Sequence, residues 1–144
     1  IIEMDLSLQK PIFVTCSEDH TVRVWDYSKM VCVLSQDFTE EPCAVGLHPS
    51  GFQMAIGFRE RVRLFNVMHN ELQSFHELRA SKFRKLQYSH GGQYLACSSS
   101  VVLNIYSSNT FEVVASLTGH VSPVRCITWT HDDLSIFTAG GDGE

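Results

Sequence analysis

The sequence repeats itself with a period of 41 residues, and this period constrains the fold more than any other feature. Two positions mark the frame: one ends a short apolar segment, and the other lies eight residues later in the next apolar segment. The first position is occupied by Leu6, Leu47, Tyr88 and Trp129, and the second by Val14, Ala55, Ala96 and Phe137. Apolar and polar residues alternate with period two around both marks, which favours strands over the 3.6-residue period of helical repeats. The chain is therefore predicted to contain four similar β units.

Each of the first three units divides into four short strands that are separated by turn residues such as Gly91-Gly92. The predicted strands are 2–6, 12–16, 21–26 and 30–35 in the first unit, 43–47, 53–57, 61–66 and 71–76 in the second, and 83–88, 93–98, 102–107 and 112–118 in the third. The fourth unit contains only 123–129 and 134–139. Four-stranded repeats of about 40 to 45 residues are typical of propeller blades. We therefore predict an all-β fold, a partial β-propeller of about three and a half four-stranded antiparallel blades.

Short motifs at the ends of these strands connect the repeat to a known family. The third strand of each complete unit ends in an aromatic residue followed by a polar one, namely Trp25-Asp26, Phe65-Asn66 and Tyr106-Ser107. A Gly-His pair, Gly119-His120, opens the fourth unit. With these motifs the chain resembles the WD-repeat family over its whole length. The resemblance implies that residues 1–144 are part of one WD-repeat propeller, with blades at about 1–35, 42–76 and 83–118 and an incomplete blade at 123–144. It also implies that the remaining blades lie elsewhere in the same protein.

The resemblance further implies a structural hydrogen-bond network in some of the blades. In this family the network joins a histidine, a serine or threonine, an aspartate and a tryptophan, and each bond contributes about 0.5–1.5 kcal/mol net. The matching residues are Thr15, Asp19 and Trp25 in the first blade and His120, Thr138 and Asp142 in the fourth. Blades two and three have a turn that is one residue shorter, with Arg59 and Ser100 near the aspartate position. We expect these two blades to rely on packing instead.

Three patterns invite an interpretation as a catalytic or ligand site. Ser17, Asp19 and His20 contain the residue types of a hydrolytic triad, but neighbours on one tight turn point in diverging directions. The seven histidines do not form a metal-ligand spacing, and His48, His90 and His131 recur at similar turns as repetition alone would place them. Gly140, Gly141 and Gly143 precede a predicted strand, whereas a phosphate loop leads into a helix. We therefore expect no enzyme activity, no metal and no cofactor.

The composition limits the kinds of partner and the cellular compartment that we expect for this chain. The net charge of -5 disfavours non-specific attraction to nucleic acid or anionic membrane. No apolar segment is long enough to span a bilayer, which takes about 18 or more residues. The five cysteines are widely spaced and do not form a CxxC pair, so we expect thiols in a reducing cytoplasmic compartment rather than disulfides or a zinc site.

Basic residues gather between the second and third units. Arg79, Lys82, Arg84 and Lys85 lie within seven residues, and Arg59 lies in a turn that a WD propeller would place on the same face. We predict that these five residues form a basic rim beside an acidic connection at residues 37–41. The rim is either an ordinary solvated surface or a docking site for an acidic partner, where charge pairs would mainly speed and orient association.

The function that we expect is that of a non-catalytic scaffold for protein–protein interaction. Segments such as TCSEDHTVRVWDY and LHPSGFQMAIGF resemble the WD-repeat proteins of the axoneme. This resemblance implies a structural subunit of the cilium or flagellum that supports inner dynein arms, with dynein-arm subunits or tubulin as partners and coiled-coil segments in other regions. The alternative is a substrate-adaptor propeller of a cytosolic complex such as a ubiquitin ligase or a vesicle coat. The sequence leaves this alternative open.

Overall fold

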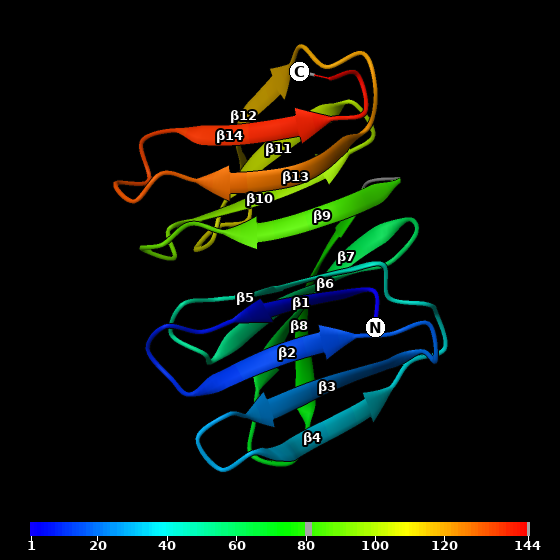
Figure 1. Cartoon of the computed structure of the whole chain (residues 1–144), viewed down its shortest axis with the longest axis vertical. Helices are drawn as coiled ribbons and strands as arrows, with labels where there is room; N and C mark the ends of the chain where they lie inside the picture. The colour runs from blue at the N-terminus through cyan, green and yellow to red at the C-terminus, as the bar shows by residue number, and fades with distance from the viewer. Residues whose placement is uncertain (80–81, 144) are drawn as a thin grey trace.

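The computed structural model describes residues 1–79 and 82–143, and these residues form 14 strands and no helix. The strands arrange as three four-stranded antiparallel sheets and one two-stranded sheet, and each sheet keeps the order of the sequence (Figure 1). The first sheet contains β1 (Glu3–Leu6), β2 (Ile12–Cys16), β3 (Thr21–Asp26) and β4 (Val31–Asp37). The second contains β5 (Ala44–Leu47), β6 (Gln53–Gly57), β7 (Arg61–Val67) and β8 (Leu72–Arg79). The third contains β9 (Phe83–Tyr88), β10 (Tyr94–Ser99), β11 (Val102–Ser107) and β12 (Val113–Thr118), and the fourth contains β13 (Val124–Trp129) and β14 (Ile136–Gly140).

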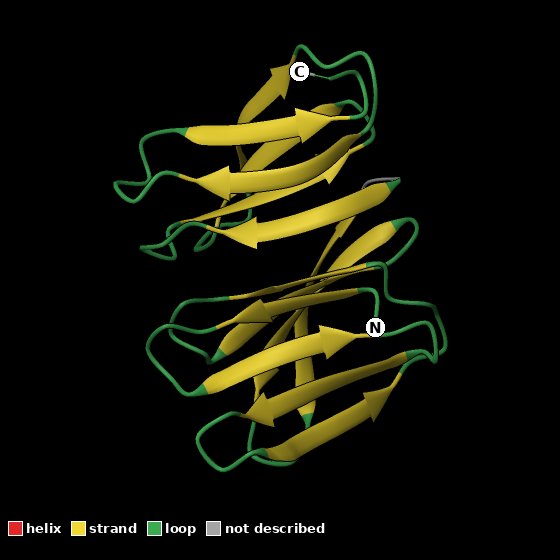
Figure 2. Cartoon of the chain, viewed as in Figure 1, coloured by secondary structure: helices red, strands yellow, loops and turns green. Residues whose placement is uncertain are grey.

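The arrangement confirms the predicted all-β, partial propeller fold. The first strands of the four sheets, β1, β5, β9 and β13, follow one another as neighbours (Figure 1). All described connections are turns or loops (Figure 2). Among the described residues there is consequently no helix long and apolar enough to cross a membrane.

Three apolar clusters hold successive sheets together. Val14, Val24, Ile56 and Phe65 belong to the cluster of the first and second sheets, and they are at most 1% exposed. The second cluster joins the second and third sheets, and the third joins the third and fourth sheets around Trp129. Alternation along each strand explains this arrangement, because successive side chains point to opposite faces and each inner sheet packs on both. Each sheet is therefore covered only where a neighbouring sheet is present.

Several strand ends differ from those predicted, and local hydrogen bonds explain the largest differences. β8 continues three residues beyond His76, because Arg61 pairs with Arg79 and the buried Leu78 extends the alternation. β14 begins two residues after Leu134, because the preceding turn is closed by hydrogen bonds from Leu134 N to Asp132 and from Ser135 N to Thr130.

The innermost strand of the first sheet, β1, carries charged side chains on its inner side. Met4 and Leu6 of β1 are 56% and 49% exposed, whereas Glu3 and Asp5 on the other side of the strand face the neighbouring sheets. Asp5 Oδ2 accepts a hydrogen bond of 2.7 Å from Leu47 N, and burial raises the pKa of this carboxyl. The alternation along β1 therefore places its charged side chains, rather than its apolar ones, against the neighbouring sheets.

Candidate functional site

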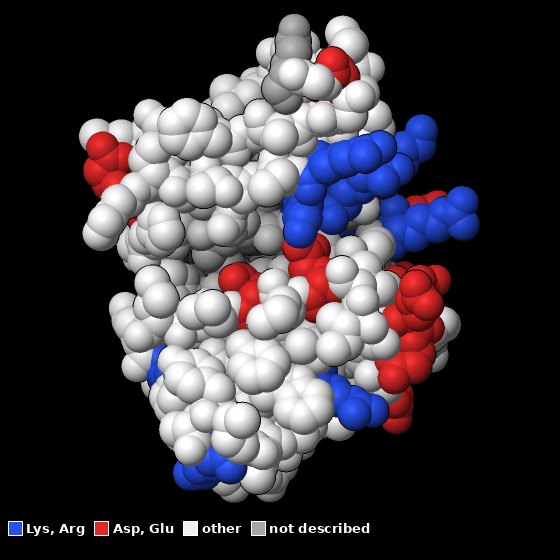
Figure 3. All heavy atoms as spheres, viewed as in Figure 1, with Lys and Arg blue, Asp and Glu red and all other residues white. Residues whose placement is uncertain are grey.

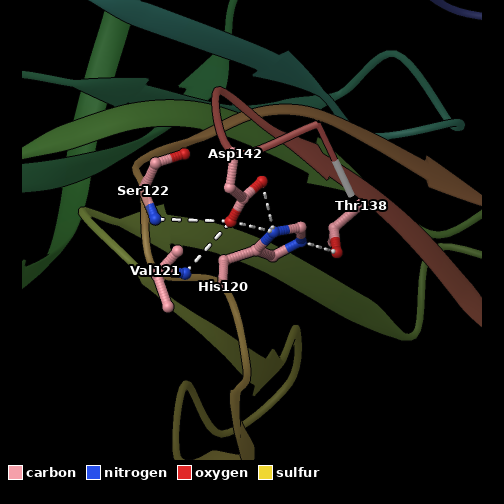
Figure 4. A network of polar contacts seen from close by, with 5 residues as sticks. All are labelled: His120, Val121, Ser122, Thr138 and Asp142. Atoms are coloured by element: carbon pink, nitrogen blue, oxygen red, sulfur yellow. Dashed lines mark hydrogen bonds and ion pairs between the residues drawn. The ribbon is translucent and has the colours of Figure 1, made fainter.

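His120 lies at the centre of a polar network that ties the loop before β13 to β14 (Figure 4). Its Nδ1 lies 3.1 Å from Asp142 Oδ2, and its Nε2 lies 2.8 Å from Thr138 Oγ1. A carboxylate only accepts hydrogen bonds, so in the neutral ring the proton is on Nδ1 and Nε2 accepts from the Thr138 hydroxyl. Asp142 Oδ2 also accepts from Val121 N at 3.0 Å and Ser122 N at 3.3 Å. The structure thus brings together all three residues predicted for this blade.

The order aspartate, histidine, hydroxyl is also that of a hydrolytic triad, so the network could be either catalytic or structural. A triad acts with free N–H donors that stabilise the developing oxyanion. Here the nearby N–H groups of Val121 and Ser122 are both bonded to Asp142. We therefore interpret the network as a structural clamp between a loop and a strand.

In the first sheet, a hydrogen bond joins Trp25 of β3 to Thr15 of β2. Trp25 Nε1 donates to Thr15 Oγ1 at 2.9 Å, and Thr15 is only 5% exposed. Asp19 lies apart from this pair in the turn, where it accepts from Thr21 N at 3.1 Å and from Thr21 Oγ1 at 2.7 Å. The bond from the Thr21 hydroxyl lowers the pKa of Asp19. Of the three residues predicted for this blade, Thr15 and Trp25 are therefore hydrogen-bonded to each other. Asp19 instead stabilises the turn before β3.

Asp26 is a structural residue that the sequence reasoning missed. Its Oδ1 accepts from Ser28 Oγ at 2.6 Å, from Ser28 N at 2.9 Å and from Lys29 N at 3.1 Å, and so closes the turn between β3 and β4. The hydrogen bond from the Ser28 hydroxyl lowers the pKa of Asp26. An aspartate two residues before a serine is a signal for such a turn.

Three residues of the predicted basic rim, Arg59, Arg79 and Lys82, line one groove at the edge of the second and third sheets. This groove has a volume of about 920 Å³ and also contains Glu40, Glu41, Glu60 and Glu77. Within it Arg61 forms ion pairs with Glu40 and Glu77. The groove is therefore of mixed charge, as the neighbouring basic and acidic patches in Figure 3 show.

A second groove continues from the first, and the charged residues that line it are all basic. Its volume is about 760 Å³, and its charged lining residues are Arg59, Lys82, Arg84 and Arg125. None of the described residues that line it is acidic. Arg125 was not part of the predicted rim, although it follows Arg84 by one repeat of 41 residues.

Lys85 does not lie on this rim. It pairs with Glu3 of β1 beside a small cavity of about 150 Å³ that Asp5 and Gln87 also line. Burial raises the pKa of Glu3, and the hydrogen bond from Lys85 opposes this effect. Adjacent strand residues point to opposite sides, so Arg84 and Lys85 face different surroundings. Assigning Lys85 to the rim was therefore incorrect.

Comparison with known proteins agrees with this geometry. The WD domain, G-beta repeat family matches residues 3–26 and 111–144, which include the Trp25-Asp26 and Gly119-His120 motifs. This chain belongs to the WD-repeat proteins. Cilia- and flagella-associated protein 57 A of Tetrahymena thermophila is 38% identical over 99% of the chain, and cilia- and flagella-associated protein 57 of Mus musculus is 32% identical over 99% of it. A third relative, cilia- and flagella-associated protein 57 C of Tetrahymena thermophila, is 36% identical over 99% of the chain. The chain spans only 11% to 12% of the length of these relatives.

The recurring turn histidines of this WD-repeat chain connect neighbouring blades. His48 Nε2 lies 3.1 Å from the Gly92 carbonyl oxygen, and His90 Nε2 lies 3.3 Å from the Trp129 carbonyl oxygen. Asp133 adds a clamp from the fourth blade, since its two carboxylate oxygens accept from His90 N and Gly91 N. Within the described residues no group of three potential metal ligands is present. These turns are therefore best explained as contacts between blades.

Proposed function

We propose that this chain is part of a non-catalytic scaffold for protein–protein interaction, and that the scaffold is a structural subunit of the ciliary or flagellar axoneme. Within the axoneme it supports the assembly or regulation of inner dynein arms. The observation that carries this proposal is the similarity along 99% of the chain to proteins named cilia- and flagella-associated protein 57 in two organisms.

The geometry supports the scaffold role. Apolar clusters connect all four blades, and turns that are clamped by His48, His90 and Asp133 hold neighbouring blades in place. Loops on such a rigid frame present side chains at a fixed spacing, which favours recognition of another protein. The residues Thr15, Asp19, Trp25, His120, Thr138 and Asp142 belong in this proposal to the frame rather than to a reaction.

The basic rim is an argument for a partner with an acidic surface. Arg59, Arg79, Lys82 and Arg84 lie on the edge where the connections between blades gather, and we propose that tubulin or a dynein-arm subunit docks there. The net charge of -5 makes nucleic acid a poor partner, since binding to nucleic acid depends on a surplus of positive charge. The corresponding localisation is the cytoplasmic cytoskeleton of the cilium or flagellum.

The proposal is tested by locating the full-length protein in a ciliated cell. We expect the tagged protein to remain with the axoneme after detergent extraction, and we expect cells without it to lose inner dynein arm density in electron micrographs. Retention without any change in the inner arms would support the axonemal scaffold but contradict the dynein role.

The substrate-adaptor alternative predicts a different result in the same experiment. An adaptor of a ubiquitin ligase or vesicle coat would be extracted with the detergent-soluble cytoplasm and would co-purify with that complex. The similarity to ciliary proteins favours the axonemal proposal over this alternative.

A further inference from the structure

The second groove is built from equivalent positions of the four blades. Ile2, Cys43, Arg84 and Arg125 follow one another at intervals of 41 residues, and all four line the groove. Each lies at, or within one residue of, the beginning of the first strand of its blade. At this repeat position the first two blades therefore contribute uncharged side chains and the next two contribute guanidinium groups. These four positions define an apolar half of the groove, at Ile2 and Cys43, and a cationic half, at Arg84 and Arg125.

Backbone hydrogen bonds hold the cationic half in place. Lys82 N donates to the Arg59 carbonyl at 3.0 Å, Ser100 N donates to the Lys82 carbonyl at 3.3 Å, and Val124 N donates to the Ser100 carbonyl at 3.0 Å. This series connects the second, third and fourth blades. Lys82 and Ser100 adopt left-handed backbone angles, with φ of 61° and 55°. Such angles are uncommon in residues other than glycine and persist where the surroundings impose them. The groove is therefore preorganised.

The cations of this groove are available for a ligand. Arg59, Lys82, Arg84 and Arg125 are all exposed, and within the described part of the chain none of them has an ion-pair partner. Arg61 next to them shows the contrast, because it is paired with two glutamates. Figure 3 shows basic side chains gathered at this edge, above an acidic patch on the adjoining blades. Four like charges that face one cavity repel one another, and an anionic ligand relieves this repulsion.

The uncharged part of the lining indicates what kind of anion fits. Ile2, Cys43, Phe83 and Pro123 border the same cavity, and Ile2 is 39% exposed. A free phosphate or polyphosphate has no apolar group to place against them. A peptide supplies carboxylates and an apolar side chain together, and a central apolar anchor with charged surroundings is typical of protein interfaces.

We propose that this groove binds an acidic segment of a partner protein, with one bulky apolar side chain against Ile2 and Cys43 and flanking carboxylates on Arg84, Arg125, Arg59 and Lys82. This inference rests on the proposed scaffold function and names the chemistry of the partner. Arginine is suited to the role because its planar donor fork binds carboxylates in a bidentate manner.

Binding of a fluorescent nine-residue peptide to the full-length protein tests the inference. The probe has a single leucine between four glutamates on each side, and anisotropy measures its affinity. We expect the double variant R84E/R125E to weaken binding by about tenfold or more, since it reverses two of the four charges that the carboxylates contact. The matched control K10E/K29E changes the net charge equally in two turns between strands of the first blade, and should stay within about twofold of the unmodified protein.

Two further measurements test the apolar half of the groove. Replacing the leucine of the probe by serine should weaken binding by about fivefold, and in the variant Ile2→Ser this difference should shrink, because the anchor loses its partner. Inorganic polyphosphate at equal charge should compete poorly. The inference would be overturned if R84E/R125E and K10E/K29E weakened peptide binding equally, or if replacing the leucine of the probe had no effect on affinity. It would also be overturned if polyphosphate bound as tightly as the peptide.

The outcome separates this inference from the proposed function. If the full-length protein remains with the axoneme but R84E/R125E binds the peptide unchanged, the groove assignment fails and the scaffold proposal stands. If the peptide binds as expected but the protein is absent from the axoneme, the groove stands and the ciliary proposal fails.

Discussion

At the scale of single residues, a few partly buried polar contacts connect neighbouring strands and loops. Thr15 and Trp25 join β2 to β3, while His120 joins a loop to Thr138 of β14. In each contact a polar group lies within the packed part of the blade, where losing one partner costs more than losing both.

Thr15→Val should destabilise the propeller by about 1–2 kcal/mol, because the Trp25 indole N–H loses its acceptor. In the double variant Thr15→Val/Trp25→Phe neither group of the pair remains, so its effect should be smaller than the sum of the single effects. Urea unfolding followed by circular dichroism measures all three variants. Strict additivity would show that the hydrogen bond does not contribute.

His48 should make stability depend on pH. Burial lowers the pKa of His48 below the ordinary value of 6.5, although the hydrogen bond with the Gly92 carbonyl opposes this effect. The neutral ring therefore favours the folded state above pH 6.5, and this contribution is lost as the pH falls below 6.5, where the unfolded histidine takes up a proton first.

The measurement compares urea midpoints at pH 7.5 and 5.5 for the unmodified protein and for His48→Gln. The unmodified protein should lose more stability than the variant between these values. Glu3 and Asp5 have raised pKa values and act in the opposite direction, with stability gained as they are protonated. They are present in both proteins, so an identical pH dependence of the two would contradict the role of His48.

At the scale of elements, the turns between the first and second strands fasten one blade to the next. The Gly92 carbonyl oxygen contacts His48 Nε2 of the preceding blade, and Gly92 has a φ of 74°. A Cβ added to Gly92 would lie 2.3 Å from His48 Nε2. The close approach of the two blades therefore depends on a residue without a side chain.

Gly92→Ala should destabilise the propeller by about 1–2 kcal/mol from the left-handed backbone alone, with an added cost for displacing His48. Gly119→Ala is the matched control, because no described atom beyond its two chain neighbours lies within 4 Å of the added Cβ. Thermal unfolding of the two variants measures the difference. Equal melting temperatures would contradict the proposed role of this turn.

The repeat predicted the order of the strands, because one 41-residue frame places equivalent strands in every unit. Five strands begin and end as predicted, among them β2 and β9, since alternation and turn residues agree there. The length of β8 depends on pairing across the sheet with Arg61, which is not a local signal. Arg125 could have been found from Arg84 by the repeat. The inward position of Glu3, by contrast, depends on a charge partner that lies 82 residues away in the chain.

At the scale of the whole molecule, the unpaired basic side chains and most of the large exposed apolar side chains lie on different parts of the surface. Free cations gather at one edge, while the carboxylates of β1 point inside. Large apolar side chains are exposed on the first and fourth blades, where Met4 is 56%, Phe137 67% and Leu134 84% exposed. Exposed apolar faces of this kind, next to an unpaired strand edge, favour association.

The 144 residues expressed as an isolated fragment should therefore self-associate or be poorly soluble. Sedimentation velocity over a range of concentrations measures this, and Leu134→Ser/Phe137→Ser should reduce the association. A single monomeric species with a sharp, cooperative melting transition would contradict the expected exposure of these faces.

Zero-length carbodiimide cross-linking in isolated axonemes tests the central claim most directly, because it joins a lysine amine only to a carboxylate in contact with it. Lys82 lies in the basic groove, while Lys29 lies in the turn between β3 and β4 and serves as the internal control. We predict that Lys82 becomes linked to an aspartate or glutamate of another axonemal protein and that Lys29 does not. Absence of the protein from axonemes, or links of Lys82 confined to its own chain, would contradict the account.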